Sequence, residues 1–78
     1  ITIMVQFMYA KKQVDKLLIF QESENTFVFT WYFQEELIWT EKRVYSSPEE
    51  KPNAEDIVNH KKECCFIIDN LEVVWQQQ

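Results

Sequence analysis

Residues 26–33 have the sequence TFVFTWYF, a run of β-branched and aromatic side chains. Such residues favour β-strands, and side chains alternate between the two faces of a strand. Phe27, Phe29, Trp31 and Phe33 therefore share one face, and the residues between them share the other. The run predicts a strand with one fully aromatic face, in a protein organised around a β-sheet.

The flanking segments extend this pattern in both directions. Residues 14–22 place Leu17 and Ile19 opposite Leu18 and Phe20, and residues 37–45 resume the alternation after a polar break. The links at residues 23–25 and 34–36 are only a few residues long. A parallel crossover needs a dozen or more residues, so these three segments are predicted to form an antiparallel meander.

Two further segments have strand character. Residues 1–9 alternate Ile, Ile, Val, Phe and Tyr with Thr, Met, Gln and Met, which predicts a strand covered on both faces. Residues 64–75 are again extended, with Asp69 and Asn70 at the centre. This last segment fits either a hairpin that turns at these two residues or one long strand.

One helix is expected, near residues 54–62. Asn53 suits the N-cap, and Glu55 and Asp56 in the first turn complement the positive end of the helix dipole. Ala54, Ile57, Val58 and Lys61 fall on one stripe, so the helix is predicted to lie on the sheet by a narrow face.

The 78 residues, with a mass of 9.5 kDa, allow one domain, residues 1–78. The predicted fold class is α+β: an antiparallel β-meander of four to five strands with one short helix near residues 54–62 on one face. The alternative is a small all-β barrel in which residues 54–62 form only a turn.

The chain contains no glycine. Glycine-rich phosphate loops, dinucleotide-binding fingerprints and the nucleophile elbow of hydrolases are therefore all absent. The carboxylate pairs, such as Glu49 and Glu50, are sequence neighbours whose side chains diverge. The chain is not expected to be an enzyme, and no catalytic residue or cofactor-binding residue is predicted.

Metal binding is not expected either. His60, Cys64 and Cys65 are the only histidine and thiols, and a structural zinc site usually needs four converging ligands. Two adjacent cysteines suit small buried or surface side chains better than a metal site. Because no other thiol exists to pair with them, a reducing compartment is favoured.

The net charge is −5 and the sequence pI is about 4.7. Direct nucleic-acid binding is not expected, because neutralising phosphates requires a basic surface. No membrane association is expected, because the longest apolar run, residues 17–20, is far shorter than a membrane span and no signal peptide is visible. A cytoplasmic location is predicted.

The aromatic row of residues 27–33 is interpreted as the core face under the helix. The opposite face is also partly apolar, and a small domain of this kind often buries such a face in a partner. Val28, Tyr32 and Ile38 are the partner-binding candidates on that face. The predicted function is a non-catalytic protein–protein interaction module, with a homodimer as one form of that interaction.

Acidic residues support an alternative function. Residues 22–56 hold nine acids against three bases, and Glu35 and Glu36 lie in a predicted exposed turn. The alternative is a small acidic inhibitor of viral or phage type, which occupies a basic nucleic-acid-binding site on a partner protein. Glu35 and Glu36 are its candidate contact residues.

Overall fold

The computed structural model describes residues 11–77. In chain order, the elements are β1 (Lys12–Gln13), β2 (Lys16–Ser23), β3 (Thr26–Phe33), β4 (Glu36–Val44), α2 (Ala54–Cys64), β5 (Phe66–Ile67) and β6 (Glu72–Gln77). The strand predicted over residues 1–9 lies outside the described part of the chain.

The main sheet has four strands in the order β4-β3-β2-β6. The antiparallel meander predicted for residues 14–45 is confirmed, since β3 pairs antiparallel with both β2 and β4. The expectation of a purely antiparallel sheet is wrong, because β6 runs parallel to β2. The connection from β4 to β6 contains a helix and is long enough to carry the chain across the sheet for a parallel pairing.

The C-terminal segment is neither a hairpin nor one long strand. β5 pairs parallel with β1 in a separate two-stranded sheet, whereas β6 belongs to the main sheet. Within residues 11–77 the main sheet is open, with β4 and β6 at its edges, so the structure does not support the alternative of a closed barrel.

Helix α2 begins where the sequence predicts. The side chain of Asn53 accepts a hydrogen bond from the backbone N–H of Asp56, at 3.1 Å, which satisfies one of the free donors of the first turn. The helix continues to Cys64, two residues beyond the predicted end. Ile57 and Lys61 are its buried residues, as the predicted stripe requires.

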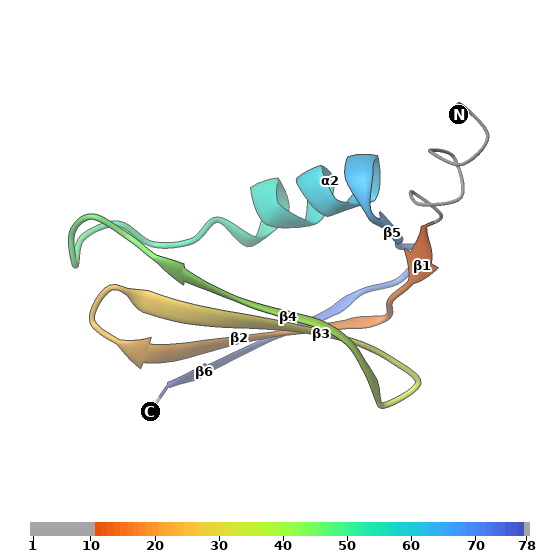
Figure 1. Cartoon of the computed structure of the whole chain (residues 1–78), viewed down its shortest axis with the longest axis horizontal. Helices are drawn as coiled ribbons and strands as arrows, with labels where there is room; N and C mark the ends of the chain where they lie inside the picture. The colour runs from red at the N-terminus through yellow and green to blue at the C-terminus, as the bar shows by residue number, and fades with distance from the viewer. Residues whose placement is uncertain (1–10, 78) are drawn as a thin grey trace, which may run out of the picture.

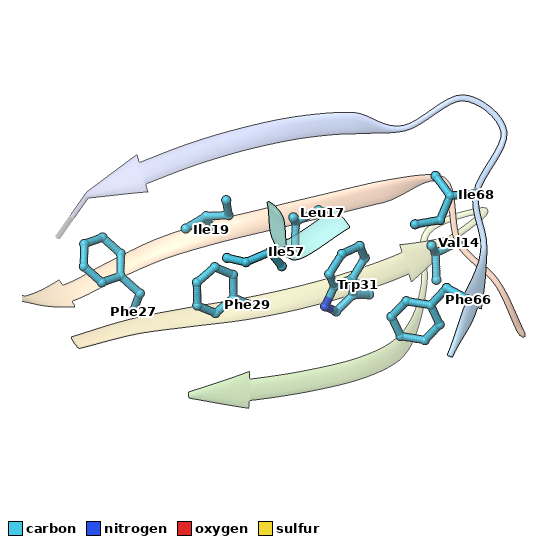
Figure 2. Close-up of a cluster of buried hydrophobic side chains, with 9 residues drawn as sticks. All are labelled: Val14, Leu17, Ile19, Phe27, Phe29, Trp31, Ile57, Phe66 and Ile68. Carbon is cyan, nitrogen blue, oxygen red and sulfur yellow. The ribbon is translucent and has the colours of Figure 1, made fainter. Parts of the chain in front are cut away.

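Helix α2 packs on one face of the sheet, and the core lies between them (Figure 1). The aromatic row of β3 is confirmed as the centre of this core, with Phe29 and Trp31 fully buried and Phe27 almost so. Leu17 and Ile19 of β2 lie beside that row, and Ile57 of the helix lies over it (Figure 2). Val14, Phe66 and Ile68 complete the buried cluster at the Trp31 end.

A β-bulge in β4 changes which residues face the core. Trp31 pairs with Trp39, and Tyr32 pairs with Leu37, so Ile38 is the extra residue. The prediction that Ile38 shares a face with Val28 and Tyr32 is therefore wrong, and Ile38 packs against the core. Leu37 takes the place beside Tyr32, because the extra residue shifts the alternation of the strand by one position.

The β3–β4 turn is made without glycine. Gln34 and Glu35 both have positive φ, of 50° and 68°, a conformation that costs a non-glycine residue roughly 1–2 kcal/mol. The side chain of Asp15 accepts a hydrogen bond from the backbone N–H of Gln34 at 3.0 Å, which helps to hold this turn. Glu35 in this turn and Glu36 at the start of β4 are both exposed, as predicted.

Truncation of Trp31 tests the core assignment. Trp31→Ala should lower the free energy of unfolding by about 3–5 kcal/mol, because a large buried ring leaves a cavity. That loss is comparable with the total stability of a small domain. Trp39→Ala is the matched control, since this side chain is 53% exposed, and should cost less than about 1 kcal/mol. Urea denaturation of both variants measures the difference, and equal losses would contradict the assignment.

Candidate functional site

The face of the main sheet that points away from α2 is the strongest candidate site. No described element covers it (Figure 1). Strand alternation and the pairing register place on this face apolar residues from all four strands. We call the following set the outer face: Leu18, Phe20, Val28, Tyr32, Leu37, Val44 and Val74.

The outer face is more solvated at its β4 side than at its centre. Leu37 and Val44 are 57% and 69% exposed, whereas the outer-face residues of β2 and β3 are half-buried. The centre is shielded mainly by neighbouring side chains of the same face, as in any closely spaced sheet. The surface that results is partly apolar, with the hydrogen-bonded hydroxyls of Thr30 and Thr40 among the apolar side chains, and surfaces of this kind commonly form protein interfaces.

Charges on the outer face are few and balanced. Lys16 lies with its ammonium group 5.5 Å from the centre of the Tyr32 ring, and its strand neighbour on β6 is Glu72. Lys42 forms an exposed ion pair of 2.9 Å with Glu22. Two bases and two acids therefore accompany the apolar residues, although the chain as a whole carries a charge of −5.

The structure brings together only part of the predicted partner-binding set. Val28 and Tyr32 lie on the outer face and Ile38 does not, whereas Glu35 lies in the β3–β4 turn and Glu36 is the first residue of β4. Sequence reasoning missed the contributions of Leu37, Val44 and Val74, together with Leu18 and Phe20. The alternation of Leu18 and Phe20 against Leu17 and Ile19 was a signal that could have identified two of them.

On the helix side, an ion-pair cluster joins α2 to β4. Lys61 Nζ lies 2.7 Å from one carboxylate oxygen of Glu41, and Arg43 Nε lies 3.3 Å from the other. Burial raises the pKa of Glu41, but hydrogen bonds and charge attraction from Lys61 and Arg43 outweigh it and lower the pKa below the ordinary value of 4.5. The cluster therefore contributes to the attachment of the helix.

The two thiols lie together at the C-terminal end of α2. Their sulfur atoms are 2.9 Å apart, and both cysteines are free. The hydrogen bond with Cys64, followed by burial, raises the pKa of Cys65 above its usual range, which keeps that thiol protonated and weakly nucleophilic. Within residues 11–77 no three histidine, cysteine or acidic side chains converge as metal ligands.

The hollows formed by residues 11–77 include two on the helix side of the sheet. The larger, about 530 Å³, is lined by Gln21, Phe27, Lys51, Trp75, Gln76 and Gln77. A smaller apolar hollow of about 200 Å³ is lined by Trp39, Lys61, Cys65 and Phe66. None of the partner-binding residues predicted from the sequence lines either hollow.

Comparison with known proteins gives no relative: the chain matches no protein-family model, no curated protein and no solved structure. In the part of the chain that the structure describes, no helix is long and apolar enough to span a membrane.

The ion pair between Glu41 and Lys61 gives a pH-dependent prediction. Glu41→Gln should lower the free energy of unfolding at neutral pH by about 1–3 kcal/mol, because it leaves the buried Lys61 ammonium without its carboxylate partner. Glu22→Gln, which breaks the exposed pair with Lys42, is the matched control and should cost less than about 1 kcal/mol.

The sign of the pH effect follows from the lowered pKa of Glu41. A carboxyl group whose pKa is lower in the folded state stabilises the fold above its unfolded pKa. The stability difference between wild type and Glu41→Gln should therefore be full above about pH 5.5 and shrink as the pH falls through 4.5 and below. Denaturation curves across this range measure it, and a difference that grows in acid would contradict the assignment.

Proposed function

We propose that this chain is a non-catalytic protein–protein interaction module that binds a protein partner through the outer face. The observation that carries the proposal is the one-sided cover of the sheet within residues 11–77: helix α2 lies on one face, and apolar residues from β2, β3, β4 and β6 occupy the other. Burial of such a surface in a partner is favourable by roughly 25 cal/mol for each Å² removed from water.

The charge pattern favours an apolar contact over the acidic-inhibitor alternative. Glu22 and Glu41 are engaged in ion pairs with bases of the same chain, so they are only partly available to a basic partner. Glu35 lies in the β3–β4 turn and Glu36 begins β4, at one end of the outer face. A cytoplasmic location fits the proposal, since a reducing compartment keeps Cys64 and Cys65 as free thiols.

Capture of partners from a cell extract, repeated with three variants, tests the proposal. A protein that binds the wild-type chain should be lost on Tyr32→Ala combined with Leu37→Asp, because the contact is apolar and these residues lie side by side on the outer face. Trp39→Ala, a change on the helix side at a side chain about as exposed as that of Leu37, should retain it. Binding should change little between 0.1 and 1 M salt.

The third variant, Glu35→Lys combined with Glu36→Lys, distinguishes the acidic-inhibitor alternative. The proposal expects this reversal of charge to leave capture of the same protein nearly unchanged. Loss of capture with this variant, together with a steep fall in binding as salt rises and indifference to the Tyr32 and Leu37 changes, would contradict the proposal and favour the alternative.

A further inference from the structure

The two edges of the main sheet differ in how they are protected. Edge strand β4 carries four charged residues and a bulge, features that discourage pairing with another strand. Edge strand β6 carries Glu72 as its only charged residue, has no proline, and keeps an unbroken register against β2 from Glu72 to Gln77. Among residues 11–77, β6 pairs with β2 alone (Figure 1).

The backbone direction of β6 identifies the groups that are open to a partner. The N–H of Glu72 donates to the carbonyl oxygen of Asp15 at 3.0 Å, so the backbone polar groups of Glu72 point toward β2. These groups alternate in direction along a strand. The N–H and C=O groups of Val73 and Trp75 therefore point away from β2 and the rest of the main sheet.

The side chains of the same two residues are exposed apolar groups. Val73 is 37% and Trp75 is 53% exposed, on the face that α2 covers only in part. An added strand would cover both. An occupant of this edge must therefore supply outward-pointing backbone groups and apolar side chains at matching positions.

We propose that the occupant is the β6 strand of a second copy of this chain, paired antiparallel about a two-fold axis at Val74. This register places Val73 of each copy opposite Trp75 of the other, so that the residues with open backbone groups exchange hydrogen bonds. Glu72 then lies opposite the neutral Gln76, and no like charges meet. The result is one continuous sheet with the strand order β4-β3-β2-β6 of one copy followed by β6-β2-β3-β4 of the other.

The homodimer does not depend on the proposed function. It joins the outer faces of two copies side by side, which would give the assembly two neighbouring partner-binding surfaces. Since each copy carries a charge of −5, the association is opposed by long-range repulsion and should tighten as salt rises.

Analytical ultracentrifugation of charge variants tests the pairing. The wild-type chain at about 100 µM should sediment mainly as a dimer. Val73→Lys with Trp75→Lys places lysines opposite each other twice and should abolish the dimer, although it reduces the net negative charge. Val73→Lys with Trp75→Glu places opposite charges together and should restore association, with a dissociation constant about tenfold or more below that of the double-lysine variant.

Disulfide trapping tests the register. In a background of Cys64→Ser and Cys65→Ser, Val74→Cys should form a covalent dimer with oxidised glutathione, because the two-fold axis brings position 74 of each copy to a Cα separation near 4.5 Å. Gln76→Cys, the control on the same strand and face, should remain monomeric. A monomeric wild-type chain, or cross-linking of position 76 but not position 74, would overturn the proposal.

The Tyr32→Ala and Leu37→Asp variant separates this proposal from the proposed function. It should retain the dimer, because both residues lie on the far side of β2 from β6. Dissociation of the dimer by this variant would show that the copies associate through the outer face instead, which contradicts the β6 pairing.

Discussion

Packing of α2 onto the aromatic row of β3 is the contact on which the rest of the structure depends. An eleven-residue helix is only about 16 Å long, whereas an eight-residue strand spans about 27 Å, so the helix covers little more than half of the sheet's length. Other aromatic residues cover the two ends of the core. The ring centres of Phe66 and Trp31 are 5.0 Å apart at one end, and those of Tyr45 and Phe27 are 5.7 Å apart at the other.

This limited cover explains which surfaces remain open. One short helix can bury one face of the sheet, and within the described residues nothing comparable lies on the other. The buried indole N–H of Trp31 has no acceptor among residues 11–77, which costs about 1–3 kcal/mol of stability. Packing of the aromatic row of β3 into the core outweighs this cost. The apolar residues of the outer face and of β6 are therefore the ones left for partners.

Much of the fold follows from the sequence because it depends on local chemistry. The composition of residues 26–33 predicts β3 and its buried face, and Asn53 with two acids after it predicts the start of α2. The pairing of β6 could not be predicted in this way. A long connection permits either strand direction, and the position of β6 beside β2 depends on where α2 packs.

The candidate site was less predictable than the core. Strand periodicity assigned Val28 and Tyr32 to the correct face, but the bulge at Ile38 reversed the faces of the residues before it. A bulge inserts one residue without a reliable sequence signal, particularly in a chain that has no glycine to mark it. The position of β6 at the edge of the sheet could not be predicted from the sequence either, because it depends on the order of the strands.

The most direct test of one-sided cover compares neighbouring leucine side chains by NMR. A soluble paramagnetic agent broadens methyl signals in proportion to their solvent access. In the chain without a partner, the methyl signals of Leu17 and Ile57 should be protected, because both residues lie in the core. Those of Leu37, on the outer face, should be strongly broadened, and those of half-buried Leu18 should be broadened clearly more than those of Leu17. Equal protection of Leu17 and Leu18 would contradict the account, since it would mean that the outer face is covered.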